Sequence, residues 1–226
     1  MLVSFAAMAT PANVVVLATL HGFHESVPAY GFARLKQIIE QIHPDILCLE
    51  VQAQDLQERA PEKVKVEYPR VIYPLIGQHH YRTCTLEPAE PEFSAIVKPY
   101  AASARAFRAG HPQQAKAFDA YAESGLDALR TYWSSPERVN DGITDAVFAA
   151  KHRLQEAMIG AGENAGWEGW NRHFQKVIVD TARENPGQRI VVLVGVEHTY
   201  WLRRHLKQQP GIRLENTAAL VGAMHK

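Results

Sequence analysis

The sequence predicts an α/β protein with a mostly parallel sheet of four to five strands and a helical insertion before the last strands. Apolar, β-branched runs of strand length occupy residues 13–19, 46–50 and 189–194. These runs lack polar alternation, which is typical of parallel strands buried on both faces. Helical patterns separate the runs. A strand, a helix and a second strand in this order imply parallel pairing through a right-handed crossover.

Length and composition predict one globular domain. The chain has 226 residues, of which 46% are hydrophobic and 21% charged, close to the average for such domains. We therefore expect a single α/β domain over residues 1–226, with the helical insertion at about residues 91–184. Lysine plus arginine and aspartate plus glutamate both number 24, so the net charge is zero. Neither a nucleic acid nor a membrane is an expected partner, since both favour a basic surface.

The first part of the chain is predicted to carry three strands. Residues 29–42 form a helix after the first strand, because apolar residues recur there at helical spacing: Leu35, Ile38, Ile39 and Ile42. Pro44 ends this helix before the second strand. Residues 52–80 are predicted to be an irregular helical connection, and residues 81–86 a third strand. In a competing interpretation residues 70–76 are the strand, but Pro74 argues against a central one.

Helical periodicity continues through the predicted insertion. Four apolar stripes follow one another, with breaks at Gly110-His111-Pro112, Ser134-Ser135-Pro136 and Gly160-Ala161-Gly162. These breaks predict roughly four helices. The sheet then resumes with a fourth strand at residues 189–194, a helix at residues 200–206 and a short edge strand at residues 212–214.

The cysteines and the N-terminus bear on the cellular compartment. Cys48 and Cys84 both lie in runs that we interpret as strands, and two such cysteines favour buried thiols over a disulfide framework. This interpretation predicts a reducing, cytoplasmic setting. Residues 1–12 are apolar but begin without lysine or arginine, so we do not expect a signal peptide.

Polar side chains follow the predicted strands at the point where each strand ends. They are His21 after the first strand, Glu50 after the second, Glu87 after the third, and Glu197 with His198 after the fourth. Ligands of open α/β sheets bind outside the carboxyl ends of the strands, where these residues would meet. Imidazole and carboxylate together suit zinc, manganese or iron. The alternative for each residue taken singly is a solvated loop position or a helix cap.

The expected roles follow from this chemistry. His21, Glu50 and His198 would hold a divalent metal, whose bound water becomes a nucleophile near neutral pH. Glu197 is the candidate general base. Glu87 is a further candidate catalytic carboxylate, which could also hold the metal and its water beside Glu50 or in its place. His24 and Glu25 rank below the residues at the strand ends. The other histidines are expected at surface or helix positions: His43, His111, His152, His173, His205 and His225.

Asn171 and Arg172 lie in the last helix of the insertion. Asn171 falls at the edge of an apolar stripe, where a polar side chain needs a partner. Arg172 could bind a carboxylate or an anionic intermediate through two hydrogen bonds, or it could face water.

At these residues the chain resembles the TraB/Tiki/EreA-like superfamily, which also includes ChaN-like haem-binding proteins. Two G-x-x-H-like motifs carry the resemblance: Ala18-Thr19-Leu20-His21, with alanine in place of the leading glycine, and Gly195-Val196-Glu197-His198. The segment Pro44-Asp45-Ile46-Leu47-Cys48-Leu49-Glu50 matches the acidic element between them, and Thr85-Leu86-Glu87 resembles the third element. Asn171-Arg172 stands in reversed order at the place of the family's Arg-Asn pair.

The resemblance implies a hydrolase-like site made of His21, Glu50, Glu87, Arg172 and His198. The leading expectation is metal-assisted hydrolysis of an amide or ester bond in a small-molecule or peptide substrate, with Asn171 and Arg172 stabilising the oxyanion. A second expectation is a metal-independent esterase, in which a histidine activates water and a glutamate orients it. A third is a protein that binds haem or another ligand without turnover.

Overall fold

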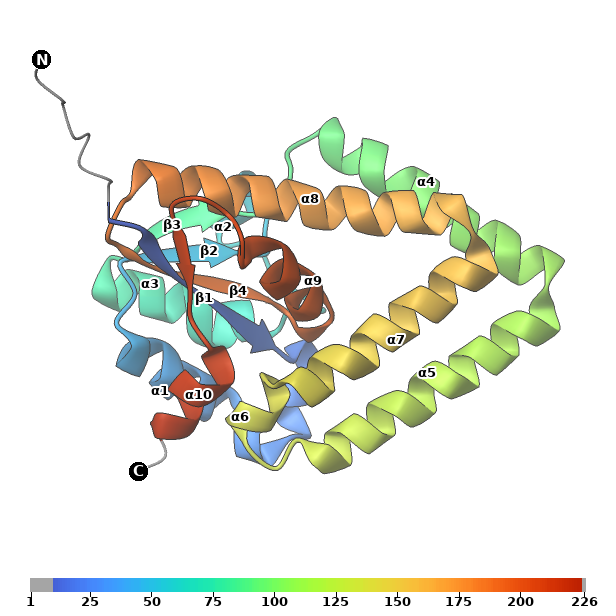
Figure 1. The fold of residues 1–226 in the computed structure, drawn as a ribbon, viewed down its shortest axis with the longest axis horizontal. Coiled ribbons are helices and arrows are strands. Elements are labelled where there is room, and N and C mark those ends of the chain that lie inside the picture. Colours follow the sequence, from blue (N-terminus) through green and yellow to red (C-terminus); the bar gives the residue numbers. More distant parts are fainter. Residues whose placement is uncertain (1–9, 225–226) are drawn as a thin grey trace, which may run out of the picture.

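The computed structural model describes residues 10–224, and within them a five-stranded sheet has the order β3-β2-β4-β1-β5 with every pair parallel. The α/β class and the parallel sheet are confirmed (Figure 1). The strand bounds are β1 (Ala12–Thr19), β2 (Ile46–Leu49), β3 (Arg82–Thr85), β4 (Arg189–Gly195) and β5 (Ile212–Leu214).

The register brings the carboxyl ends of the central strands to one edge. β1 pairs with β4 from Asn13 opposite Arg189 to Thr19 opposite Gly195. On the other side of β4, Leu49 of β2 lies opposite Leu193. The residues that follow β1, β2 and β4 therefore meet at the carboxyl edge of the sheet, next to its central strand β4.

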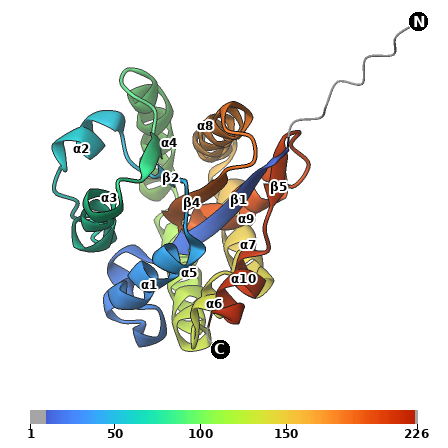
Figure 2. The same ribbon diagram turned by 90° about the vertical axis from the view of Figure 1, so that its left-hand side faces the viewer.

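Alternate strand residues build two apolar layers, one on each face. Val15 and Leu17 of β1 pack with the layer that contains Leu35 of α1 (Phe32–Ile42). Val14 and Val16 pack with the opposite layer, to which α8 (Ala161–Glu184) and α9 (Val196–Leu206) contribute. Figure 2 shows α1 and α8 on opposite sides of the sheet. Burial on both faces explains why these strands are continuously apolar.

The connection from β1 to β2 and the connection from β2 to β3 are both partly helical. Two 3₁₀ turns, η1 (His21–Glu25) and η2 (Pro28–Tyr30), delay α1 until Phe32, later than predicted. After β2 come α2 (Ala53–Glu58), a π-helical turn η3 (Tyr68–Ile72) and α3 (Tyr73–His79). The competing interpretation of residues 70–76 as a strand is wrong. Pro69 and Pro74 each lie in the first turn of a helical segment, where proline is tolerated.

The insertion consists of α4 (Glu92–Gly110), α5 (Pro112–Tyr132), the short α6 (Pro136–Val139), α7 (Gly142–Ile159) and α8. At each of the three predicted breaks one helix ends and the next begins. The Ser135 side chain accepts a hydrogen bond from the backbone N–H of Arg138 and so caps α6. Figure 1 shows α4, α5 and α7 beyond the ends to which the strand arrows point, whereas α8 returns across the sheet. A last helix that we did not predict, α10 (Thr217–Ala223), follows β5.

The prediction of free thiols is wrong, because Cys48 and Cys84 form a disulfide. Cys48 lies directly opposite Cys84 in the β2–β3 register, with the Cα atoms 4.5 Å apart. This spacing is within the range that a disulfide spans, but it exists only once the two strands pair. Because the two cysteines form a disulfide, free thiols no longer support the prediction of a reducing, cytoplasmic setting.

The structure bears on the expectation about membranes but not on most of the expectation about a signal peptide. Among the described residues, each helix is too short or too polar to cross a membrane. The expectation for residues 1–12 falls mostly on residues 1–9, which lie outside the described residues.

A buried polar network joins the insertion to the sheet. The Oδ1 atom of Asn140 accepts hydrogen bonds from the Ala18 N–H at 3.0 Å and from the Arg203 guanidinium at 2.9 Å. The Asn140 Nδ2 atom donates to the Pro136 carbonyl at 3.0 Å. Arg203 also donates to the Val16 carbonyl at 2.9 Å. One amide therefore connects β1, α6 and α9.

Replacing Asn140 by alanine is expected to lower the free energy of unfolding by about 1–3 kcal/mol, because the buried Ala18 N–H loses its acceptor. Urea denaturation would measure the change. Asn164→Ala, on the partly exposed surface of α8, is the control and is expected to change stability little. Equal stability of the two variants would contradict a structural role for Asn140.

Candidate functional site

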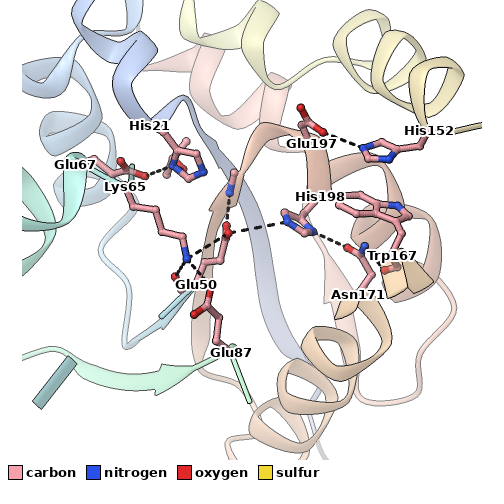
Figure 3. A network of polar contacts seen from close by, with 12 residues as sticks. His21, Glu50, Lys65, Glu67, Glu87, His152, Trp167, Asn171, Glu197 and His198 are labelled. Carbon is pink, nitrogen blue, oxygen red and sulfur yellow. Dashed lines mark hydrogen bonds and ion pairs between the residues drawn. The ribbon is translucent and has the colours of Figure 1, made fainter. Parts of the chain in front are cut away.

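Three strand ends bring the predicted residues together at one edge of the sheet. His21 follows β1, Glu50 follows β2, and Glu197 with His198 opens α9 directly after β4. Figure 3 shows these residues, with Lys65, Glu67 and Glu87 reaching the same edge from the connections on either side of β3.

His21 forms a dyad with Glu67. Its Nδ1 atom lies 2.8 Å from Oε1 of Glu67, whose side chain is fully buried. An ionised carboxylate only accepts, so Nδ1–H is the donor and Nε2 carries the lone pair of the neutral ring. Among the described residues, Oε2 of Glu67 has no hydrogen-bond partner. The dyad fixes both the orientation and the tautomer of the imidazole.

The surroundings raise the pKa of His21 above its ordinary value. Burial by itself lowers this pKa, but the hydrogen bond to Glu67 and the negative charges of Glu50 and Glu67 outweigh it. His21 can therefore gain and lose a proton at a pH somewhat above the usual range of histidine.

Gly195 makes room for His21. A Cβ atom at this position would lie 2.7 Å from His21 Nε2, which is too close for a real contact. The φ angle of Gly195 is −52°, which any residue adopts, so space and not backbone conformation requires the glycine. This explains physically why a glycine opens the second G-x-x-H-like motif.

Glu50 is the buried carboxylate at the centre of the edge. Its Oε2 atom accepts a hydrogen bond from the Gly195 N–H at 2.6 Å. Its Oε1 atom lies 3.5 Å from Lys65 Nζ and 4.0 Å from His198 Nε2. Burial raises the pKa of Glu50, but the charge of Lys65, with those of His198 and His21, brings it down to about 2. Glu50 is therefore an anion at every physiological pH.

Lys65 is the cation between two carboxylates. Its ammonium donates to the backbone carbonyl of Glu50 at 2.6 Å and to Oε1 of Glu87 at 2.5 Å. Burial lowers the pKa of Lys65, but the charges of Glu50 and Glu87 raise it above its ordinary value. The pKa of Glu87 is raised by burial, which the charge of Lys65 opposes.

His198 is held as a neutral ring. Its Nδ1–H donates to Oδ1 of Asn171 at 2.9 Å, and the Asn171 amide in turn donates to the Trp167 carbonyl. The ring stacks on Trp167 with 4.6 Å between the ring centroids. Burial lowers the pKa of His198 to about 4, so Nε2 is an acceptor that faces Glu50.

Glu197 is paired with the Lys151 ammonium, bonds His152 as well, and is not poised as a base. Its Oε2 atom accepts from Lys151 at 2.6 Å and from His152 at 3.0 Å. Burial raises the pKa of Glu197, but His152 and Lys151 lower it to about 2. A carboxylate held in this state is a weak proton acceptor, which argues against the expected role of general base.

Arg172 lies outside the site, contrary to our expectation. Its side chain is 71% exposed and lies 3.4 Å from Glu168, four residues earlier on α8. Successive residues of a helix are about 100° apart, so the turn that buries Asn171 directs Arg172 to solvent.

His24 has a structural role. Its Nε2 atom accepts from the Leu20 N–H at 2.9 Å, and its Nδ1 atom bonds the Tyr30 carbonyl. Both ring nitrogens are therefore used within η1 and η2. Glu25 forms an exposed ion pair with Arg70. The spacing of His21 and His24 does not produce a pair of metal ligands.

The arrangement does not fit the divalent metal that the resemblance implies. Within residues 10–224, no group of three or more His, Cys, Asp or Glu side chains has the geometry to hold a metal ion. The Lys65 ammonium lies between Glu50 and Glu87, where a metal would otherwise neutralise these carboxylates.

A cavity of about 550 Å³ opens at the same edge, a volume typical of small-molecule sites. His21, Gly195 and His198 line its floor together with residues from the insertion. Most of its walls are apolar, and they include Leu126, Trp133, Phe148 and Trp167. His21, whose ring Glu67 orients from behind, therefore borders a largely apolar cavity.

Four residues of this site were not predicted to belong to it: Lys65, Glu67, His152 and Trp167. Lys65 and Glu67 belong to Lys63-Val64-Lys65-Val66-Glu67, where charges alternate with valines in a segment without helical periodicity. That alternation is a usable signal for one face, but it does not give the partner of each charge. His152 was expected at a surface or helix position. It lies on α7 but is buried, and it stacks on Trp167 with 3.8 Å between the centroids.

Comparisons with known proteins identified no relative: no family model, no curated protein and no solved structure matches the chain.

Replacing Glu67 by glutamine is expected to lower the pKa of His21, because the ring loses a charged hydrogen-bond acceptor. NMR titration of the imidazole would measure the shift. Glu25→Gln, which changes an exposed carboxylate in the same way, is the matched control. A His21 pKa that is the same in both variants would contradict the dyad.

Proposed function

We propose that this protein hydrolyses an ester or amide bond in a small-molecule or peptide substrate, with His21 activating the attacking water. The observation that carries the proposal is the contact of 2.8 Å between His21 Nδ1 and the buried Glu67, beside a cavity that His21 lines. A histidine oriented by a carboxylate at the floor of a pocket is a common arrangement for general-base catalysis.

The proposed reaction begins with proton transfer to His21. Its Nε2 atom takes a proton from water while the water oxygen attacks the carbonyl carbon of the substrate. Glu67 accepts the Nδ1–H bond throughout and stabilises the imidazolium that forms. The tetrahedral intermediate then collapses, and the imidazolium gives its proton to the leaving alcohol or amine. The products are an acid and an alcohol or amine, and His21 is neutral again.

The N-terminus of α9 would stabilise the negative charge of the intermediate. Val196, Glu197 and His198 form the first turn of this helix and line the cavity. The first N–H groups of a helix lack intrahelical acceptors and carry partial positive charge, so they suit an oxyanion. The N-cap residue of α9 is Gly195, which has no side chain that could accept a hydrogen bond from these N–H groups.

The metal-assisted form of this hydrolysis is the weaker candidate. It would place a metal on His21, Glu50 and His198, and Lys65 would have to leave Glu50. The metal-independent esterase that the resemblance also includes agrees better with the contacts of Lys65. Membership of the TraB/Tiki/EreA-like superfamily is part of this proposal and rests on the sequence motifs.

His21→Ala is expected to lower kcat by about 10²–10⁴, the usual contribution of a general base. In the wild type, kcat/KM should rise with pH through the pKa of His21, which lies above 6.5, because only the neutral ring accepts a proton. Rates for a panel of p-nitrophenyl esters would measure both effects. His111→Ala, a change in the exposed turn between α4 and α5, is the control. Unchanged turnover in His21→Ala would refute the proposal.

Metal analysis would distinguish the two mechanisms. Protein purified without a metal-binding tag is expected to contain well below one equivalent of zinc, manganese or iron and to stay active after exhaustive chelation. The reason is the position of Lys65 between the two carboxylates. About one equivalent of metal, lost in both His21→Ala and His198→Ala, would instead support the metal-assisted reaction.

A further inference from the structure

Exposed apolar side chains gather around the cavities of the insertion. Among the described residues, five large apolar side chains are exposed: Phe23, Val64, Tyr121, Ile143 and Leu154. Phe23 and Val64 line the 550 Å³ cavity beside His21, called here the inner cavity. Tyr121 lines a second cavity of about 250 Å³, called here the outer cavity. Three of the five exposed apolar side chains therefore border these two cavities, and exposed apolar groups that cluster in this way mark binding sites.

The two cavities adjoin. Leu126, Phe148 and Glu197 line both of them. The outer cavity lies between α5 and α7, with Leu129 and Val147 in its walls. Leu126 and Phe148 therefore form a mostly apolar wall that the two cavities share, with His21 lining the inner cavity and Tyr121 the outer one.

We propose that the inner and outer cavities form one channel for an extended apolar chain, so that the substrate is an ester or amide of an aliphatic acyl group. This inference rests on the proposed hydrolysis at His21. The reacting carbonyl would lie at His21, and the acyl chain would pass between Leu126 and Phe148 into the outer cavity.

The polar groups of the channel favour an aliphatic chain over a peptide. Glu197 and Lys151, which both line the outer cavity, are paired with each other at 2.6 Å. Paired charges offer little to the amide groups of a peptide, whose desolvation would then be uncompensated. An alkyl chain carries no such groups, and burial in an apolar channel favours it in proportion to the area removed from water.

Chain length is therefore expected to control kcat/KM. Each methylene buried in the channel should raise it by roughly fourfold until the channel is full. Wild-type protein would be tested with p-nitrophenyl acetate, hexanoate and decanoate, and the ratio of kcat/KM for decanoate to that for acetate is the readout.

Leu126→Trp would fill the junction of the two cavities and is expected to lower this ratio at least tenfold. Leu154→Trp is the matched control, because Leu154 is 37% exposed on α7 and borders neither cavity. This control should keep the wild-type ratio. Val147→Phe, which narrows only the outer cavity, gives a second variant if Leu126→Trp does not fold, as judged by thermal unfolding.

A binding measurement separates the channel from the chemistry. Decanol should displace the dye 1-anilinonaphthalene-8-sulfonate from the wild type and from Leu154→Trp, but at least tenfold less effectively from Leu126→Trp. Displacement in this pattern without hydrolysis of any ester would support the channel and refute the proposed function. Hydrolysis of acetate and decanoate at equal kcat/KM, with dye displacement unchanged by Leu126→Trp and Val147→Phe, would overturn the channel and leave the hydrolase standing.

Discussion

The buried carboxylate of Glu50 is the interaction on which the carboxyl edge of the sheet depends. It accepts the Gly195 N–H at 2.6 Å and so links the end of β2 to the start of α9. Burying an ion is costly unless charges and hydrogen bonds compensate for it. Lys65 supplies the nearby cation, and the same ammonium extends the network to Glu87. The need to neutralise Glu50 therefore explains the position of Lys65. The same contact fixes the part of the β2–β3 connection that carries Lys65. In turn, the bond to Gly195 keeps this glycine against His21, where a Cβ atom would not fit.

One carboxylate faces two imidazoles that differ in protonation. His21 and His198 both feel the charge of Glu50, which raises the pKa of each. The balance differs because His21 also bonds the carboxylate of Glu67, whereas His198 bonds the neutral amide of Asn171 and stacks on Trp167. Burial therefore dominates at His198 and brings its pKa to about 4, while the charges dominate at His21. A site whose titratable groups are pushed in opposite directions can assign proton transfer to one group and hydrogen-bond acceptance to the other.

The parts that could be predicted from sequence are those that local pattern determines. The apolar runs indicate β1, β2 and β4. Because ligands of open α/β sheets bind at the carboxyl ends of the strands, the sequence alone predicts that His21, Glu50 and His198 lie at one edge. Features that depend on register or helix phase could not be obtained in this way. The disulfide exists because Cys48 lies opposite Cys84, and Arg172 points outward because its neighbour Asn171 points inward. Lys65 and Glu67 lie in a connection without helical periodicity, and their alternation with valines does not name their partners, so only the folded chain shows which carboxylate or ring each contacts.

The helical insertion takes part in the site as well as covering it. Asn171 and Trp167 of α8 fix the ring of His198, and Lys151 and His152 of α7 hold Glu197. Stacked rings join these helices to α9, since Trp167 of α8 stacks both on His152 of α7 and on His198 of α9. A displacement of α7 or α8 would therefore disturb the imidazole at the sheet edge and the walls of the two cavities together. It follows that the proposed selection of the acyl chain and the proposed chemistry are physically coupled. The Asn140 network, which joins α6 to β1 and α9, supplies part of the rigidity that such coupling requires.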